Sequence, residues 1–215
     1  MQIALFGGRF DPVHNGHVAI AKEVLKAVPS IDEVWMVPDN HHHLNPTVVS
    51  AKQRLEMLRL IENDPSINAQ ERIKASDIGI LVSKYRNNMT VTIDVIRALQ
   101  GDPKYTKEIA SMMPSQKDEP NTYLFIAGAD QLPRLTEWYE YKELHMRLPF
   151  LIFPRKGYKT SGDLPEGCMW LSDREFEPME DSASRVREYL KNGKDISTLV
   201  PKSIAGYIRK KGLYK

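Results

Sequence analysis

Short apolar runs alternate along this chain with longer segments in which apolar residues recur every three or four positions. The runs are typical of buried strands and lie at 3–6, 34–38, 123–127 and 150–153, with weaker ones at 72–82 and 168–171. Helical spacing follows most of them, at 18–28, 55–61, 91–99, 183–192 and 201–212. Strands that alternate with helices predict an α/β protein with a doubly wound parallel sheet.

The length of 215 residues suits one large α/β domain, so we expect residues 1–215 to form a single domain. The composition shifts to Pro, Lys, Asp, Glu and Ser at 102–121, which predicts an exposed excursion from that domain. Residues 50–53 read Ser-Ala-Lys-Gln and have the form of a capping box that begins a helix. Arg54 and Arg59 on this helix are expected to be solvated surface charges without a role.

The composition also limits the partners and the cellular setting. Thirty Lys and Arg residues stand against 28 Asp and Glu residues, and the resulting net charge of +2 argues against nucleic acid or an anionic membrane as a partner. Cys168 is the single cysteine, so an internal disulfide is excluded. No stretch approaches the roughly 18 apolar residues of a membrane span. We therefore expect a cytoplasmic protein, with the question of a homo-oligomer left open.

The densest group of residues with a chemical rationale lies at 7–17, between the first predicted strand and the first predicted helix. In an open α/β sheet, ligands bind at such a loop, and the following helix points free N–H groups and its positive dipole at them. We expect Gly7 and Gly8 to let the chain turn and to let a phosphate approach the backbone. His14 and His17 are three residues apart, so they should project from one side of the first helical turn toward the same ligand.

Later segments reach the same predicted edge of the sheet. Gly128 and Asp130 directly follow a strongly apolar strand, where Asp130 would hold a ribose hydroxyl or a cation, or else cap a helix. The turn after the next strand carries Arg155. The segment from Ser182 to Arg187 opens a helix with hydroxyls and a guanidinium that would suit a polyphosphate, although serine capping beside a surface arginine fits the same residues.

Two further segments have competing interpretations. His41, His42 and His43 stand in a polar loop, but adjacent side chains on extended backbone alternate in direction, and no spaced carboxylate or cysteine accompanies them. A metal site is therefore disfavoured, and contact between His43 and an anionic ligand is the preferred interpretation. The aromatic segment from Trp138 to Tyr141 fits either a packed core or a stacking wall for a flat ligand, and the pattern alone favours the core.

Taken together, these segments resemble the nucleotidyltransferases of the nicotinate-nucleotide adenylyltransferase type. Residues 7–17 match the signature G-G-x-F-D-P-x-H-x-G-H of that family at every fixed position. The likeness extends over essentially the whole chain, through the segments Gly128-x-Asp130, Trp138-Tyr139-Glu140-Tyr141, Arg155-x-Gly157-Tyr158, Ser182-x-Ser184-x-x-Arg187 and Gly212-Leu213-Tyr214. The resemblance implies a Rossmann-like nucleotidyltransferase fold.

The resemblance also implies an activity and a division of roles. The activity is transfer of an adenylyl group from ATP to the 5′-phosphate of nicotinate or nicotinamide mononucleotide, which yields the dinucleotide and pyrophosphate in NAD biosynthesis. Mg²⁺ is expected to arrive bound to the nucleotide, with no dedicated protein metal site. The resemblance assigns catalysis to His14, His17 and Arg187. It assigns ATP binding to Gly7, Gly8, Phe10, Gly16, Gly128, Asp130, Arg155, Ser182 and Ser184, and acceptor binding to Asp11, His43, Thr90, Trp138 and Tyr139.

Departures from the family pattern concern the acceptor. Where the family often has Tyr-Thr-x-x-Thr, residues 89–93 read Met-Thr-Val-Thr-Ile, and residues 43–45 replace the usual P-H-[KR] pattern with His-Leu-Asn. The preference between nicotinate and nicotinamide is thus left open. Two alternatives remain: a nucleotidyltransferase for another phosphorylated acceptor such as phosphopantetheine, and a nucleotide-binding sensor of the same fold without turnover. A metal-dependent hydrolase is disfavoured because no acidic general base accompanies the histidines.

Overall fold

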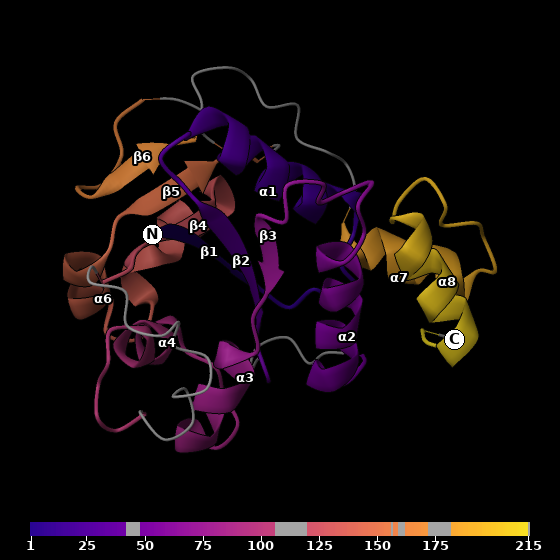
Figure 1. The fold of residues 1–215 in the computed structure, drawn as a ribbon, viewed down its shortest axis with the longest axis horizontal. Coiled ribbons are helices and arrows are strands. Elements are labelled where there is room, and N and C mark those ends of the chain that lie inside the picture. The colour runs from indigo at the N-terminus through magenta and orange to yellow at the C-terminus, as the bar shows by residue number, and fades with distance from the viewer. Residues whose placement is uncertain (42–47, 106–119, 156, 159–161, 172–181, 215) are drawn as a thin grey trace.

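Six parallel strands form one sheet in the computed structural model, which describes the chain apart from residues 42–47, 106–119, 156, 159–161, 172–181 and 215 (Figure 1). The strands are β1 (Gln2–Gly8), β2 (Glu33–Pro38), β3 (Ile73–Ala75), β4 (Thr122–Gly128), β5 (Phe150–Phe153) and β6 (Cys168–Trp170). Their order across the sheet is β3-β2-β1-β4-β5-β6, and every neighbouring pair is parallel. The order runs outward in both directions from β1, so the predicted doubly wound α/β fold is confirmed.

Helices cover both faces of this sheet (Figure 1). One face packs against α1 (Asn15–Ala27), α2 (Ala51–Glu62), α7 (Ala183–Lys191) and α8 (Lys202–Lys211). The other packs against α3 (Ile78–Ser83), α4 (Thr92–Leu99), α6 (Tyr141–Arg147) and the 3₁₀ segment η2 (Ala129–Glu137), with η1 (Lys84–Arg86) following α3. Among the described residues, no helix combines the length and the apolar character that crossing a membrane requires.

The strand β1 shows why the apolar runs of the sequence are continuous. Its residues alternate between the two faces, so Ile3 and Leu5 join one core cluster while Ala4 and Phe6 join the other. All four side chains are buried, because helices cover both faces of the parallel sheet. A strand in this position needs apolar residues at every step.

The predicted strand at 72–82 is wrong beyond its first residues. The strand β3 ends at Ala75, and the apolar residues that follow form the helix α3. A short apolar run is compatible with either structure, and here Ile78 and Val82, four residues apart, are both buried on one side of a helix. Gly79 allows this helix to approach the end of β2, since a Cβ atom at Gly79 would lie 2.8 Å from the carbonyl oxygen of Pro38.

The expected exposure of residues 102–121 does not hold for Tyr105. Its side chain is fully buried, and its ring packs edge-on against that of Tyr85 at a centroid distance of 5.0 Å. Residues 106–119 lie outside the described part of the chain. The start of this segment is therefore anchored to the α4 side of the molecule by an aromatic contact.

The last helix, α8, packs beside α2, and the chain after it turns back toward the sheet. Tyr207 on α8 donates a hydrogen bond to Glu56 Oε2 on α2 at 2.6 Å. Gly212 ends the helix in the left-handed conformation, with φ of 61°. The chain reverses there, and Tyr214 is buried in the same core cluster as Phe10 and Val13.

Candidate active site

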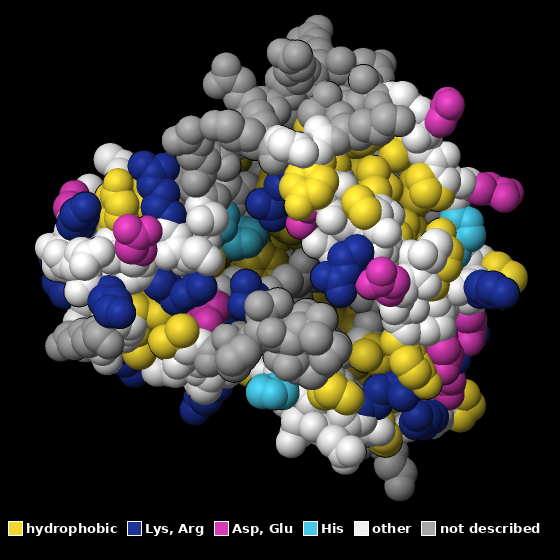
Figure 2. All heavy atoms as spheres, turned by 180° about the vertical axis from the view of Figure 1, so that it is seen from behind, with side chains coloured by type: hydrophobic (Ala, Val, Ile, Leu, Met, Phe, Trp, Pro, Cys, Tyr) yellow, Lys and Arg dark blue, Asp and Glu magenta, His cyan; other side chains and the backbone are white. Residues whose placement is uncertain are grey.

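The candidate site lies where the carboxyl ends of β1 and β4 meet. These two strands are neighbours, and the chain winds away from β1 in opposite directions, which is the position where open α/β sheets bind ligands. Gly8 ends β1 and Gly128 ends β4, so the loops that follow both strands start side by side. Figure 2 shows a hollow near the middle of one face, where histidine lies next to Lys and Arg side chains.

The loop after β1 turns at Phe10 and not, as expected, at the glycines. Gly7 and Gly8 are the last two residues of the strand, whereas Phe10 has a left-handed φ of 50°. Gly7 is required by close packing, because a Cβ atom there would lie 2.9 Å from the ring of Phe125. That these glycines let a phosphate approach the backbone stays a prediction.

His14 and His17 face each other at the start of α1. Their ring centroids are 3.7 Å apart, so the prediction that the two side chains share one side of the first turn is confirmed. The backbone N–H of His14 donates to Nδ1 of His17 at 3.2 Å. Because Nδ1 of His17 accepts this bond, the proton of the neutral ring lies on Nε2, which is then available as a donor.

Both histidines are neutral at physiological pH in the free protein. Burial lowers the pKa of His14 to about 3, with a further contribution from the positive charge of Arg155. Burial also holds the pKa of His17 well below its usual value, with contributions from His14 and Arg155. The site therefore contains two closely packed rings that have little tendency to take up a proton until a negative charge arrives.

Arg155 and Asp130 form an ion pair beside the end of β4. Arg155 Nε lies 3.2 Å from Asp130 Oδ1, and Gln131 donates to the other carboxylate oxygen at 2.7 Å. Asp130 folds back over Gly128, since a Cβ atom at residue 128 would lie 2.2 Å from Asp130 Oδ1. A side chain at position 128 would therefore displace this carboxylate from its present place beside Arg155.

Arg187 connects α7 to the loop after β1. Its Nη1 donates to the backbone carbonyl of Asp11 at 2.6 Å, and its Nη2 donates to Ser184 Oγ at 3.2 Å. Ser182 is the N-cap of α7 and accepts from the backbone N–H of Arg185 at 3.2 Å. The segment predicted as a second anion site thus lies against the first one, with Arg187 turned toward the start of its own helix.

Asp11 is buried and has protein partners on both carboxylate oxygens. Oδ2 accepts from the backbone N–H of Val48 at 2.6 Å, and Oδ1 accepts from the hydroxyl of Tyr214 at 2.7 Å. The exposed fraction of Asp11 is 1%. A direct contact between Asp11 and the acceptor stays a prediction, and the observed bonds give this residue a role in holding the loop.

Arg54 is a functional candidate that the sequence interpretation missed. It is fully buried, so its assignment as a solvated surface charge is wrong. Its guanidinium donates to the carbonyl of Arg9 at 2.7 Å, to Asp39 Oδ1 at 2.9 Å and to the carbonyl of Asn40 at 2.9 Å. One side chain therefore ties the loop after β1 to the loop after β2.

A signal for the burial of Arg54 was present in the sequence. Arg54, Leu58 and Ile61 are spaced at i, i+4 and i+7 and share the apolar face of α2. A charge on that face requires partners inside the protein. Arg59 lies on a different face, and its side chain is 55% exposed, as expected for a solvated charge.

Thr90, another residue predicted to bind an acceptor, lies beside the loop after β2. Thr90 donates from its hydroxyl to the carbonyl of Gly79 at 2.7 Å and accepts from the backbone N–H of Asn40 at 2.8 Å. It thereby joins the end of β2 to α3. His43 lies outside the described residues.

Trp138 and Tyr139 follow η2. Trp138 is partly buried and meets Phe125 and Phe150 edge-on, at centroid distances of 5.6 and 6.1 Å. Part of this ring therefore packs in the core, as the sequence pattern alone favoured. Stacking of a ligand on the part that is not packed stays a prediction. Tyr139 is half exposed, and the guanidinium of Arg86 lies 4.3 Å from the centre of its ring.

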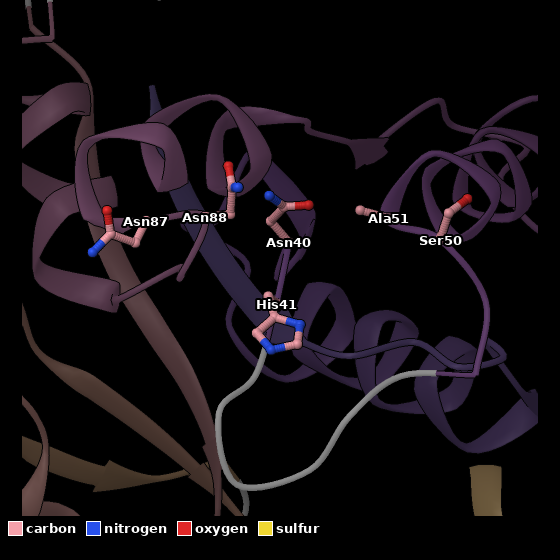
Figure 3. A pocket seen from close by; sticks show the side chains of 6 residues that line it. All are labelled: Asn40, His41, Ser50, Ala51, Asn87 and Asn88. Atoms are coloured by element: carbon pink, nitrogen blue, oxygen red, sulfur yellow. The ribbon is translucent and has the colours of Figure 1, made fainter.

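A polar pocket of about 540 Å³ adjoins this region (Figure 3). In Figure 3, side chains from the end of β2, the start of α2 and the segment between η1 and α4 surround it, namely Asn40, His41, Ser50, Ala51, Asn87 and Asn88. Amide and hydroxyl groups therefore dominate the lining. No group of three or more potential metal ligands of the His, Cys, Asp or Glu type occurs in the part of the chain that the structure describes.

Comparison with known proteins places this geometry in a family. A family model described as cytidylyltransferase-like matches residues 5–189. The nicotinate-nucleotide adenylyltransferase of Bacillus subtilis (strain 168) is 29% identical over 218 residues, with 100% of this chain and 98% of the relative covered. The probable nicotinate-nucleotide adenylyltransferase of Geobacillus thermodenitrificans (strain NG80-2) is 30% identical over 215 residues, with 99% and 86% covered.

A solved structure of Plasmodium falciparum nicotinic acid mononucleotide adenylyltransferase complexed with NaAD has the same fold. The TM-score is 0.72 at 21% identity, and the match covers 99% of this chain and 97% of that chain. The resemblance seen in the sequence motifs is thus confirmed by whole-chain comparison. The chain belongs to the cytidylyltransferase-like family, within it to the nicotinate-nucleotide adenylyltransferases, and it is a nucleotidyltransferase.

Proposed function

We propose that this protein transfers the adenylyl group of Mg·ATP to the 5′-phosphate of nicotinate mononucleotide, which gives the adenine dinucleotide and pyrophosphate. The observation that carries the proposal is the pair of facing neutral rings, His14 and His17, with Arg187 held against their loop at the junction of β1 and β4. The names of the relatives that match over the whole chain support the choice of nucleotide and acceptor.

The proposed reaction needs positioning and charge stabilisation more than proton transfer. An oxygen of the acceptor phosphate attacks the α-phosphorus of ATP, the bond from that phosphorus to the bridging oxygen of the β-phosphate breaks, and pyrophosphate leaves with the electron pair. The attacking phosphate is already ionised at neutral pH, so no general base is required. Catalysis then depends on donors held where negative charge increases.

His14, His17 and Arg187 supply these donors in our proposal. Nε2 of His17 is a donor in the free protein, because Nδ1 accepts a backbone hydrogen bond. The approach of a polyphosphate would raise the depressed pKa values of both histidines, since an opposite charge favours the protonated ring. Arg187, with the serines at the start of α7, would bind the departing pyrophosphate.

The loop after β4 would bind the nucleoside part of ATP. Gly128 and Asp130 lie at the end of the strand next to β1, and Arg155 is paired with Asp130. An ion pair of this kind offers both an acceptor for sugar hydroxyls and a donor for phosphate or base. Phe10 and Gly16, which follow β1, would line the nucleotide site from the opposite side.

Magnesium enters this proposal as part of the substrate. Both oxygens of Asp11 accept hydrogen bonds from the protein, and Asp130 is engaged by Arg155 and Gln131. The described carboxylates at the site thus fit a metal that is held by phosphate oxygens and water. The ion would neutralise part of the charge of the polyphosphate.

The acceptor would lie on the side of Trp138, Tyr139 and Thr90. The part of the Trp138 ring that is not packed on Phe125 and Phe150 offers a flat apolar face for a pyridine ring. The polar pocket beside Asn40 offers amide groups to a polar substituent. These features are compatible with nicotinate and with nicotinamide, so the acceptor assay includes both.

Pyrophosphate release is the decisive measurement. The purified protein is incubated with ATP or CTP and with nicotinate mononucleotide, nicotinamide mononucleotide or phosphopantetheine, each pair in a separate reaction. We expect rapid release with ATP and nicotinate mononucleotide. Release with phosphopantetheine alone would indicate a transferase for another acceptor, and ATP binding without release from any pair would indicate a sensor.

A further inference from the structure

The buried carboxylate of Asp11 lies at the meeting point of three segments that are far apart in the sequence. The loop after β1 contributes Asp11 itself, α7 contributes Arg187, and the turn after α8 contributes Tyr214. The Tyr214 hydroxyl reaches Asp11 Oδ1 at 2.7 Å, and the carbonyl of the same aspartate accepts from Arg187 at 2.6 Å. A residue 203 positions away thus holds the group that orients Arg187.

The side chain of Tyr214 is held in place by the core residues around it. Its exposed fraction is 7%, and it belongs to the core cluster that contains Phe6, Phe10 and Val13. Its backbone has a left-handed φ of 61°, which is uncommon for a residue with a large side chain. Burial raises the pKa of the Tyr214 hydroxyl far above its usual range, with a further contribution from the charge of Asp11. The hydroxyl is therefore a donor at every pH at which the protein is used.

We propose that Tyr214 is a positioning residue for the pyrophosphate side of the reaction, acting through Asp11 on Arg187. This inference rests on the proposed function. With the hydroxyl present, Asp11 is held from both sides, by Tyr214 on Oδ1 and by the backbone of Val48 on Oδ2. The Asp11 carbonyl then has one orientation, and Arg187 is fixed where it meets the leaving group. Without the hydroxyl, Asp11 loses its partner on Oδ1, and its backbone carbonyl, which accepts from Arg187, is held less firmly.

A purely structural role for Tyr214 makes a different prediction. A ring that only fills the core would affect the stability of the protein and leave the affinity for pyrophosphate unchanged. A positioning role instead lowers kcat and weakens pyrophosphate binding, while the KM for the pyridine nucleotide stays the same. The two roles are therefore separated by which constant changes.

The variant Tyr214→Phe removes the hydroxyl and keeps the ring. We expect kcat to fall about tenfold and the dissociation constant for inorganic pyrophosphate, measured by titration calorimetry with Mg²⁺ present, to rise about tenfold, as for the loss of one hydrogen bond to a charged group. Tyr207→Phe is the matched control, because its hydroxyl also donates to a carboxylate, on Glu56 of α2. The control variant should keep wild-type values for both constants.

Two further variants test the route through Asp11 and Arg187. If Tyr214 acts through Arg187, the double variant Tyr214→Phe with Arg187→Lys should have almost the kcat of Arg187→Lys alone, whereas full multiplication of the two effects would contradict the proposal. Asp11→Asn changes the same hydrogen bond from the other side: the amide oxygen can still accept from Val48, but Tyr214 then faces an amide N–H in place of a charged carboxylate oxygen. It takes the place of Tyr214→Phe if that variant does not fold.

The proposal is overturned if Tyr214→Phe, or Asp11→Asn in its place, stays within twofold of the Tyr207→Phe protein in both kcat and pyrophosphate affinity. The calorimetric arm requires no turnover, so it reports on Tyr214 whatever acceptor the enzyme uses. Wild-type protein without release from nicotinate mononucleotide would instead contradict the proposed function. The two failures are thus distinguishable.

Discussion

Residues 7–17, which run from the end of β1 into α1, and the pair Trp138 and Tyr139, which follows η2, are held in different ways. In the first region, His14 is 7% exposed, both carboxylate oxygens of Asp11 accept hydrogen bonds, and the carbonyl of Arg9 accepts from the buried Arg54 on α2. In the second, Trp138 is partly buried by edge contacts with other rings, and the half-exposed Tyr139 lies against a guanidinium. One region is fixed by directional bonds and the other by apolar and cation–π contacts.

The difference follows the demands of the proposed chemistry. Stabilising charge on phosphates requires donors within a few tenths of an ångström of their places, and buried hydrogen bonds provide that precision. Binding a flat ring requires area and little direction, which apolar side chains provide. We therefore expect changes around residues 7–17 to affect the rate and changes at Trp138 to affect the acceptor affinity.

Arg54→Met should give the largest effect, a loss of protein stability, because Arg54 holds the loop after β1. Removing a fully buried guanidinium takes away its hydrogen bonds to Asp39 and to the carbonyl oxygens of three residues, Arg9, Asn40 and Val49, which should lower the free energy of unfolding by roughly 3–5 kcal/mol. Urea unfolding measures the change. Arg59→Met is the control from the same helix, where the exposed side chain should change stability by less than about 0.5 kcal/mol. Equal stability of the two variants would contradict the assigned role of Arg54.

His17→Ala should lower kcat by at least about 10², because a donor to the developing charge is lost. The measurement is steady-state pyrophosphate release at saturating substrates. His145→Ala, on α6, is the control and should keep the wild-type rate. A His17→Ala enzyme with nearly normal turnover would remove this residue from the mechanism.

Trp138→Ala should act on the other region. We expect the KM for the pyridine mononucleotide to rise by an amount equivalent to about 1–3 kcal/mol of lost stacking, with kcat less affected. The variant Trp138→Phe keeps a flat ring and should recover most of the affinity. A loss of thermal stability without a change in KM would instead mean that the ring serves only the core.

The pH dependence of stability should report the buried state of His14. Its pKa is about 3 in the folded protein and near 6.5 in the unfolded chain, so only the unfolded state takes up a proton between these values. Stability is therefore present above pH 6.5 and is lost as the pH falls. Between pH 7.5 and 5.5, His14 should contribute a loss of about 1.4 kcal/mol, and His17, whose pKa is also lowered by burial, should add a loss of its own; urea unfolding measures the sum. His14→Asn should remove the His14 contribution and leave that of His17, and an unchanged slope would show that burial does not lower the pKa of His14.

Much of the fold was predictable because local rules and tertiary packing agree. The strands at 3–6, 34–38, 123–127 and 150–153 are continuous apolar runs, as expected for a sheet that is covered on both faces. The failure at 78–82 is equally instructive. Four apolar residues and a glycine fit either a strand or one side of a helix. In the folded protein they form the helix α3, and Gly79 lies close to Pro38, a contact that no local pattern contains.

The positions of the candidate catalytic side chains were easier to predict than those of the residues that support them. The spacing of His14 and His17 is a local property, so their shared direction followed from helix geometry. Arg54 and Tyr214 act across long distances in the chain, and their partners are backbone carbonyls and a carboxylate that only the folded arrangement brings near. The apolar face of α2 held a signal for Arg54. For Tyr214, the sequence offered only the likeness of residues 212–214 to the family.

The bonds from Arg187 and Tyr214 to Asp11 also set an order of events during synthesis. They join residues separated by 176 and 203 positions, so they are among the most non-local contacts that this chain can make. The signature loop leaves the ribosome well before its two supports, which are synthesised 176 and 203 residues after Asp11. We expect a nascent chain that contains residues 7–17 but lacks α7 and α8 to be unable to bind pyrophosphate.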